Sequence, residues 1–427
     1  MLILESFSSG DHKNALVHMK VLAVNKFYYL YGGADRYFLE RNELLRQRGH
    51  EVIPFAMSHE KNLSTPYADY FVSPIHFFDT KRQSRPWKIV GRVLYSSEAK
   101  RKISRLVRET RPDIAHLHNI AHQLSPSILT PLKDFGLPVV QTLHDYKLIC
   151  PTYRLLSNGE LCERCKGGRF YHAALQRCNR GSLAASALNS VEMFLHHTVL
   201  KLYDRVDRFI APSRFVQNKV VEFGVASERV VYLPHFVDLD AWSPKKERGE
   251  YIVYFGRLVE GKGVGTLIRA MKHVRKVDLY IIGEGELEGD LKGLAAREGL
   301  SHIHFLGYRS GKDLASLVAR GLFTVVPSEW YDPSPQTVKQ SLAAGRPVIG
   351  ARIGGIPELI DDGVDGMLFT PRSAEDLAGK IELLLDDRSR VEAMGAAARK
   401  KVEEQFGPAQ HYEGLMDIYR SLIGTGA

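Results

Sequence analysis

The stretch YIVYFGRLVEGKGVGTLIRAM, residues 251–271, sets the fold class of this chain. Its first residues are β-branched or aromatic and end at Phe255, which is typical of a buried strand. A glycine-rich turn follows, and helical spacing of apolar residues begins near Val264. A strand followed closely by a helix is the repeating unit of a doubly wound α/β sheet. The chain is therefore expected to contain such a sheet.

The turn in this stretch has the spacing of a phosphate-binding loop. Gly256, Gly261 and Lys262 match the pattern in which backbone amides and a lysine hold phosphate. Gly263 occupies the position where such a loop carries a Ser or Thr that holds magnesium. The turn therefore predicts a phosphate site without an obligatory metal ion, with Arg257 and Lys262 as its cations. A plain strand-to-helix turn with two exposed cations is the alternative.

Strands and helices alternate along most of the chain, and the series restarts once. The restart follows a polar loop at residues 236–249. Two doubly wound domains are therefore predicted, with ligands at the carboxyl ends of their strands and in the cleft between them. The predicted strands are 21–24, 51–55, 114–117, 138–142, 207–211 and 230–233 in the first series, and 251–255, 278–282, 303–306, 322–326 and 347–350 in the second.

A chain of 427 residues is too long for one ordinary domain, which agrees with this division. The first domain is predicted at 19–238 and the second at 239–405. Residues 1–18 precede the first strand as an upstream start or a loose tail. Residues 406–427 form an amphipathic pattern that is expected to pack back on the first domain.

Composition excludes several classes of protein. The chain is 44% hydrophobic and 25% charged, which is typical of a soluble globular protein. No run of eighteen apolar residues is present, and the opening residues do not resemble a signal peptide. A cytoplasmic protein is therefore expected, with room for peripheral attachment at the inner face of the membrane.

Positive charge is concentrated in residues 81–111. The formal net charge is +9, and this segment holds eleven Lys or Arg residues against two Glu. Apolar residues such as Trp87, Val90 and Tyr95 lie among the charges, as on an interfacial amphipathic helix. Such a surface could bind nucleic acid, anionic lipid or an acidic substrate. A solvated helix with an ordinary core face is an equally simple interpretation.

Polar and glycine residues also follow strands in the first series. His144 ends the strand LPVVQTLHD, at the edge where such sheets keep their sites. Gly32 and Gly33 follow the first strand and precede a helix, so the backbone there could approach a ligand closely. His116 and His118 share one face of a neighbouring strand end, and a packing or loop-ordering role is favoured for them.

All four cysteines lie in one insertion, residues 150–178. Cys150, Cys162, Cys165 and Cys178 include a single C-x-x-C pair. Four thiolates can hold a structural zinc ion in tetrahedral geometry. Reduced free thiols and redox disulfides remain the alternatives.

Several motifs occur together in a fixed order. They are YGGADRYF, QTLHDYKLICP, FIAPSRF, FGRLVEGKG, FLGYRS and ARIGGIPELIDDGVDGMLF. The set resembles the retaining, nucleotide-sugar-dependent glycosyltransferases of family 4, from Met19 to the carboxyl end. The resemblance implies the GT-B fold, an α/β architecture of two doubly wound Rossmann-like domains facing a central cleft. The cysteine insertion is similar to one found in a subgroup that assembles polysaccharides.

The same resemblance gives meaning to EWYDPSPQTVKQSLAAGRPVIG, residues 329–350. Family members carry two Glu residues eight positions apart before the GxPVI strand, and this chain has Asp332 and Gln340 there. The resemblance implies that the first residue binds the donor sugar and the second the ribose. Gln340 keeps an acceptor oxygen but loses the charge. Glu329 is a rival for the acid's role, although Asp332 has the matching spacing.

The start of the next helix completes the predicted donor site. Ser334 is expected to cap this helix and Pro335 to be its first residue. The free amides of Gln336 and Thr337 would then point toward a diphosphate. By resemblance, His144 would contact the donor sugar, and Gly33 would lie near the phosphates.

These features predict a retaining hexosyltransferase-like enzyme that needs no cofactor for catalysis. The donor would be a nucleoside diphosphate sugar, and the acceptor a saccharide, expected to be lipid-linked, in surface polysaccharide or glycan assembly. Arg257 and Lys262 would stabilise the leaving phosphate, with Asp332 and His144 at the sugar. Two alternatives stay open. One is a same-fold epimerase or phosphorylase, and the other a non-catalytic zinc and nucleic-acid module, although no nucleic-acid partner is expected.

Overall fold

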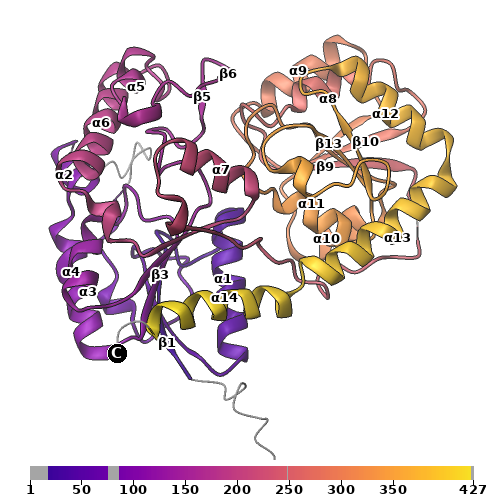
Figure 1. Ribbon diagram of the computed structural model, residues 1–427. Coiled ribbons are helices and arrows are strands. Elements are labelled where there is room, and N and C mark those ends of the chain that lie inside the picture. Colours follow the sequence, from indigo (N-terminus) through magenta and orange to yellow (C-terminus); the bar gives the residue numbers. More distant parts are fainter. Residues whose placement is uncertain (1–17, 76–85, 248, 425–427) are drawn as a thin grey trace, which may run out of the picture.

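The computed structural model describes residues 18–75, 86–247 and 249–424. The chain forms two α/β domains, each built on a parallel sheet (Figure 1). Residues 1–17 of the possible tail at 1–18 lie outside the described residues. So do residues 81–85 of the basic segment 81–111. Within those residues no helix is both long enough and apolar enough to cross a bilayer.

The first sheet has the order β2-β1-β3-β4-β7-β8 and the second the order β11-β10-β9-β12-β13-β14. All neighbouring pairs are parallel. The strands of the first sheet are β1 Lys20–Val24, β2 Glu51–Phe55, β3 Ile114–Leu117, β4 Val139–Thr142, β7 Arg208–Ala211 and β8 Val230–Tyr232. Those of the second are β9 Tyr251–Phe255, β10 Asp278–Ile282, β11 Ile303–Gly307, β12 Thr324–Val326, β13 Val348–Ala351 and β14 Gly366–Phe369.

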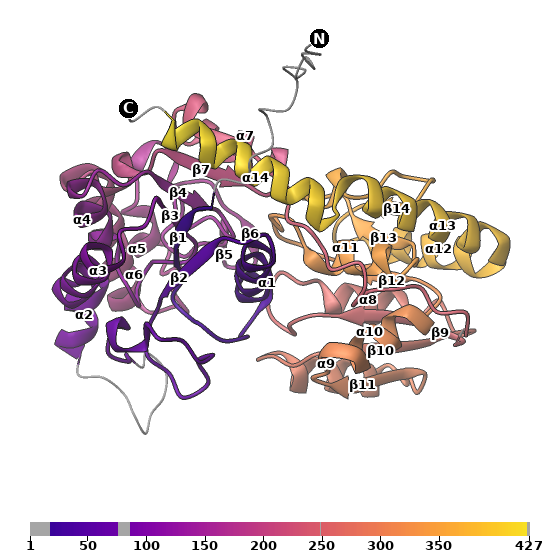
Figure 2. The same ribbon diagram turned by 90° about the horizontal axis from the view of Figure 1, so that it is seen from below.

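Helices connect these strands and cover both faces of each sheet (Figures 1 and 2). In the first domain they are α1 Gly33–Gln47, α2 Pro86–Leu94, α3 Ser97–Thr110, α4 Leu129–Asp134, α5 His172–Leu175, α6 Leu183–Phe194 and α7 Arg214–Glu222. In the remainder they are α8 Val264–Ala270, α9 Glu288–Arg297, α10 Gly311–Arg320, α11 Gln336–Ala343, α12 Ala374–Asp386, α13 Arg388–Gln405 and α14 Pro408–Ile423.

The strands explain the layers of the first domain. Side chains alternate between the faces of a strand, so β1 contributes to two separate cores. Val21 and Ala23 pack in the core that also contains α1 and α14 side chains such as Tyr419. Leu22 and Val24 belong to the opposite core, under α3 and α4. The last helix thus returns from the second domain and forms part of a core of the first, as Figure 2 also shows.

All predicted strands are present within a few residues of their expected ends. Two features were not predicted. The strand β14 lies in the turn-rich stretch after β13, and a small hairpin, β5 Leu156–Ser157 with β6 Glu160–Leu161, lies inside the cysteine insertion. The basic segment is also divided, because its described part forms the two helices α2 and α3.

Candidate active site

The glycine-rich loop after β9 is shaped by contacts with the loop after β12. Gly261 and Gly263 have φ values of 86° and 70°, which L side chains rarely adopt. A Cβ atom on Gly263 would lie 1.7 Å from the carbonyl oxygen of Pro327. The close approach excludes the Ser or Thr of a magnesium-binding loop at this position. The loop can therefore present backbone and Lys262 to an anion, and it offers no hydroxyl from residue 263.

Lys262 and Asp332 form an ion pair at the centre of the site. Lys262 Nζ lies 2.5 Å from Asp332 Oδ2, and Asp332 is only 5% exposed. Ser328 Oγ donates to the same carboxylate oxygen over 3.4 Å. The Lys262 ammonium also lies 5.3 Å from the ring centre of Trp330, within the range of a cation–π contact. The predicted phosphate lysine and the predicted sugar acid are thus brought together.

Backbone contacts fix the loop that carries Asp332. Gly355 N donates to the carbonyl oxygen of Asp332 over 2.8 Å. A Cβ atom on Gly354 would lie 2.6 Å from that oxygen, so the loop needs a glycine beside it. The two glycines of ARIGGIPE therefore hold the acid in place without touching its carboxylate.

Arg257 differs from Lys262 in its surroundings. Its side chain is exposed and forms no ion pair within the part of the chain that the structure describes. Tyr254 donates its hydroxyl proton to the carbonyl oxygen of Arg257 over 2.9 Å, which holds the backbone of the loop. Arg257 is therefore available to a ligand, whereas Lys262 already has a partner.

The start of α11 corrects one prediction. Pro335, and not Ser334, occupies the cap position, and Gln336 is the first helical residue. Ser334 Oγ accepts a hydrogen bond from Lys339 Nζ over 2.8 Å, and the helix start has no side-chain cap bond. The amides of Gln336 and Thr337 have no backbone partner among the described residues. Their amides can still bind an anion, and this role stays a prediction.

Side chains of α11 face the linker and the interior. Gln336 donates through Nε2 to the carbonyl oxygen of Phe236, in the segment between the two sheets, over 3.2 Å. Its Oε1 is buried and has no hydrogen-bond partner among the described residues. Gln340, one turn further, is buried as well. The predicted ribose-binding amide is therefore held inside the site and not on the surface.

Lys339 is a buried cation that the sequence analysis did not single out. It is fully buried on α11, and burial lowers the pKa of its ammonium to about 7, against the opposing effect of Asp332. Its ammonium donates a hydrogen bond to Ser334 and lies 5.8 Å from the centre of the Phe406 ring. On α11, Lys339 lies between the apolar Val338 and Leu342 on the buried side of the helix. A lysine among apolar residues of a helix is the sequence feature that could have revealed this buried cation.

In the first domain, His144 lies in a column of histidine rings. His144 Nε2 is 2.8 Å from His118 Nδ1, and the rings stack with centres 5.1 Å apart. Tyr37 of α1 and His235 lie against the His144 ring, with ring centres 5.5 and 5.1 Å away. Burial lowers the pKa of His144 to about 3, so its imidazole is neutral at neutral pH. It can offer a hydrogen bond but no charge.

The neighbouring His116 and His118 make different contacts, although the same packing or loop-ordering role was predicted for both. His116 is buried and bonds to Thr142 Oγ1 and Tyr419 Oη at 2.7 and 2.6 Å, which joins α14 to the first sheet. His118 instead contacts His144 directly, and its own Nε2 has no partner within the described residues. His118 therefore orients a predicted site residue, a role that the neighbouring ends of β3 and β4 would have suggested.

Gly33 begins α1 and lies in open space. A Cβ atom added there would meet nothing within 4 Å, so packing does not require a glycine at this position. Its helix places Tyr37, one turn later, against His144 and His235. The start of α1 is therefore near His144, and the space beside Gly33 is open to a ligand.

The two domains meet at the loop that carries Asp332. Ser213 Oγ donates to the carbonyl oxygen of Pro333 over 2.6 Å, and the rings of Phe215 and Tyr331 lie 4.9 Å apart. The pKa of Tyr146, in the first domain, is raised by burial and further by the negative charge of Asp332. The loop that carries Asp332 therefore contacts the first domain.

The cysteine insertion reaches the second domain on the same side. Arg154 NH1 lies 3.2 Å from Glu260 Oε2, in the glycine-rich loop. Arg372 NH1 of the second domain lies 2.6 Å from Glu160 Oε1 of the small hairpin. These pairs connect the insertion to the loop that holds Lys262.

The four cysteines are free thiols that lie near one another. Burial, together with the nearby thiols of Cys150, Cys162 and Cys178, raises the pKa of Cys165 to about 12. The pKa of Cys178 is raised for the same reasons. Among the residues described, no set of three or more His, Cys, Asp or Glu side chains is arranged to hold a metal ion. The donor chemistry suits zinc, but the side chains would have to converge to bind it.

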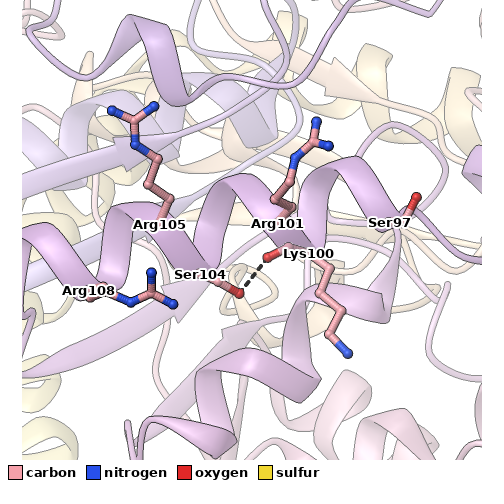
Figure 3. A pocket seen from close by; sticks show the side chains of 6 residues that line it. All are labelled: Ser97, Lys100, Arg101, Ser104, Arg105 and Arg108. Carbon is pink, nitrogen blue, oxygen red and sulfur yellow. Dashed lines mark hydrogen bonds between the residues drawn. The ribbon is translucent and has the colours of Figure 1, made fainter.

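A basic surface lies apart from this site. Figure 3 shows the cations of α3 projecting from successive turns of the helix, which borders an open hollow. The hollow is lined by Ser97, Lys100, Arg101, Ser104, Arg105 and Arg108. In Figures 1 and 2, α3 lies on the side of the first domain away from the second. The hollow is therefore not part of the site that contains Asp332.

Two family models match the chain. Glycosyltransferase Family 4 matches residues 31–241, and Glycosyl transferases group 1 matches residues 238–401. These matches and the fold define the chain as a glycosyltransferase with GT-B architecture. The models overlap at residues 238–241 and together span residues 31–401, so the chain belongs to the GT-B glycosyltransferases.

Known proteins agree with this assignment. Glycogen synthase of Mycobacterium tuberculosis is 24% identical over 415 residues, which is 91% of this chain and 91% of that protein. An uncharacterized glycosyltransferase of Methanocaldococcus jannaschii is 27% identical over 218 residues, 51% of this chain and 60% of its own length. The crystal structure of the Anabaena protein HepE in complex with UDP-glucose has a TM-score of 0.68 and 18% identity, covering 95% of this chain and 100% of that one. A glycosyltransferase structure from Rickettsia africae has the same TM-score and identity, with 96% and 100% covered.

Proposed function

We propose that this glycosyltransferase transfers a hexose from a nucleoside diphosphate sugar with retention of configuration and without a catalytic metal ion. The observation that carries the proposal is the ion pair between Lys262 and Asp332. It joins a glycine-rich loop suited to phosphate with an acid that can accept bonds from sugar hydroxyls. A related fold in HepE binds UDP-glucose, so a uridine diphosphate sugar is the first donor to test.

The hard step is departure of the nucleoside diphosphate while an oxocarbenium-like sugar forms. The exposed guanidinium of Arg257, Lys262 and the amides of Gln336 and Thr337 would stabilise the charge that grows on the leaving phosphate. The bond from the anomeric carbon to the phosphate oxygen breaks, and the acceptor oxygen bonds to the same face. A phosphate oxygen of the leaving group takes the acceptor's proton.

The neutral imidazole of His144 suits a hydrogen bond to a sugar hydroxyl and not proton transfer, because its pKa lies near 3. His118 fixes its ring through the 2.8 Å contact. Gln340 would accept a bond from ribose hydroxyls. The open space at Gly33 would admit the donor phosphates.

The acceptor is proposed to be a lipid-linked saccharide used in surface polysaccharide assembly, met at the inner face of the membrane. The basic hollow on α3 supports this part of the proposal, because anionic headgroups favour clustered Lys and Arg (Figure 3). Each such residue near an anionic surface adds on the order of 1 kcal/mol at low salt. Attachment through α3 should therefore weaken as salt is added.

The enzyme is tested with a panel of nucleotide sugars in a thermal-shift assay, since a ligand of the folded state raises the melting temperature. The donor that shifts it is then incubated with an acceptor saccharide, and the anomeric configuration of the product is read by NMR. A retained configuration in the presence of EDTA is expected. An inverted product, or transfer that EDTA abolishes, would contradict the proposed chemistry.

A further inference from the structure

Helix α6 buries several polar side chains and exposes several large apolar ones. Its buried residues are the polar Ser186, Asn189, Ser190 and Glu192 and the apolar Met193. Leu183, Val191 and Phe194 are 54%, 53% and 52% exposed. At 3.6 residues per turn these three lie on one face of the helix. An ordinary surface helix has the reverse arrangement, so this outward face is suited to contact with something apolar.

The inward side of α6 is anchored strongly. Glu192 is fully buried and lies 2.7 Å from Lys147 Nζ and 3.2 Å from His122 Nε2. Although burial opposes ionisation, these two groups hold the pKa of Glu192 at about 2. Lys147 belongs to the loop that follows His144. The helix therefore cannot turn its apolar face inward without breaking this pair.

The surroundings of the apolar face are cationic. Residues 164–203 contain a single acid, the buried Glu192. Arg177, Arg180 and Lys201 are exposed at the two ends of α6. The other cations of this segment are Arg164, Lys166 and Arg169. A second copy of the chain would bring two cationic rims together, which disfavours self-association, whereas an anionic surface would complement them.

The neighbouring helices extend the same face. α6 contacts α2 and α5. His196 Nε2, just after α6, lies 2.7 Å from the carbonyl oxygen of Leu94 at the end of α2. Val90 on α2 and Leu175 on α5 are exposed as well. In Figures 1 and 2 these helices and the basic α3 all lie on the side of the first domain away from the second.

We infer that the outward face of α6, formed by Leu183, Val191 and Phe194, docks into an anionic lipid bilayer. Apolar side chains flanked by Lys and Arg are the pattern of a helix that lies in the membrane interface. The inference rests on the proposed lipid-linked acceptor for its purpose, and it adds the element that enters the apolar layer. Charge on α3 alone would leave binding electrostatic, whereas α6 adds a component that salt does not remove.

The test uses the full chain and vesicles made of phosphatidylglycerol and phosphatidylethanolamine, with phosphatidylcholine vesicles for comparison. Two double variants are compared with the wild type, Val191→Glu with Phe194→Glu and Val191→Ser with Phe194→Ser. The serine pair removes apolar area without adding charge. A matched control places Glu at Val364 and Leu383, which are 57% and 42% exposed on the second domain.

We expect both α6 variants to lower the fraction that floats with anionic vesicles by about tenfold or more, with the glutamate pair more affected. The control should bind as the wild type does. Binding to anionic vesicles that is equal in the wild type and the serine variant would overturn the inference. So would a wild-type dimer that the variants convert to monomers, because the face would then contact protein.

Donor binding measured without lipid separates this inference from the proposed function. The α6 variants should keep the donor-induced rise in melting temperature, since Lys262 and Asp332 are untouched. Loss of flotation with intact donor binding supports the docking face. Flotation that depends on α6 in a protein that binds no nucleotide sugar would contradict only the proposed function.

Discussion

The ammonium of Lys262 lies 2.5 Å from the carboxylate of Asp332, which is 5% exposed. The acid on the loop after β12 thereby neutralises the lysine of the glycine-rich loop after β9. A diphosphate that approaches Lys262 must share it with Asp332. The pair therefore links phosphate binding to the residue proposed to hold the sugar.

Replacing Lys262 by Ala should impair both turnover and stability. Turnover should fall by roughly two to three orders of magnitude, the usual result of removing charge stabilisation from a leaving group. Because the change leaves the buried Asp332 without its cation, unfolding free energy should also fall, by on the order of 1–3 kcal/mol. Steady-state kinetics and urea unfolding measure the two effects.

Arg257→Ala is the matched control for this variant. Arg257 is exposed and unpaired within the described residues, so its loss should lower turnover with little change in stability. Full turnover in both variants would remove the proposed diphosphate clamp. Equal loss of stability in both would show that the pair with Asp332 contributes nothing to the fold.

Two assays should distinguish the role of Asp332 from that of Gln340. Asp332→Asn should lower the transfer rate, since the acid is proposed to contact the sugar, while affinity for free nucleoside diphosphate is kept or raised because the change frees Lys262. Gln340→Glu should preserve or tighten nucleotide binding, because a charged acceptor makes a stronger bond to ribose hydroxyls. Nucleotide titration and the transfer rate are the measurements. A larger loss of nucleotide affinity from Asp332→Asn than from Gln340→Ala would reverse the two roles.

Lys339 should make stability depend on pH. Burial lowers the pKa of its ammonium to about 7 in the folded protein, against about 10.4 in an unfolded chain. Between these values the unfolded chain binds more protons, so the contribution of Lys339 to the free energy of unfolding rises with pH. It should rise by about 1.4 kcal/mol per pH unit where the difference is complete. Below pH 7 both states are protonated and the contribution is constant and unfavourable.

Urea unfolding at pH 7, 8 and 9 tests this, with Lys339→Met compared with the wild type. The methionine variant should be more stable at pH 7, and the difference should shrink as pH rises. Lys400→Met, at a side chain that is 75% exposed, is the control and should show no such trend. A parallel pH profile in wild type and Lys339→Met would mean that Lys339 keeps an ordinary pKa.

The cysteine insertion is proposed to hold structural zinc. Protein prepared under reducing conditions without a chelator should then carry about one metal ion per chain, bound by four thiolates. Cys165→Ser should lower both the metal content and the melting temperature, since Cys165 lies among the other three thiols. Metal analysis by mass spectrometry decides the matter. A metal-free protein with an unchanged melting temperature would leave only free thiols.

Strand positions and the two-domain fold could be predicted because buried parallel strands leave short apolar runs between helices. β14, Gly366–Phe369, was missed because it follows a turn-rich segment. The cap of α11 was displaced by one residue because Ser334 bonds to Lys339, a tertiary contact that no local pattern contains. Pairings between distant segments, such as Lys262 with Asp332, depend on how the loops after β9 and β12 pack.

His118 could have been placed beside His144 from topology alone. β3 and β4 are parallel neighbours, and the two histidines follow their carboxyl ends. The outward apolar side of α6 was also present in the sequence, as apolar residues and a lone acid in a helical stretch. Only the burial of Glu192 shows which side faces inward.

The contacts of the cysteine insertion have a consequence for motion. The insertion holds the second domain through Arg154 with Glu260 and through Glu160 with Arg372. Any hinge opening that lets a nucleotide leave must separate these pairs or carry the insertion along. A change at the cysteines that moves the insertion would therefore also disturb these contacts with the second domain.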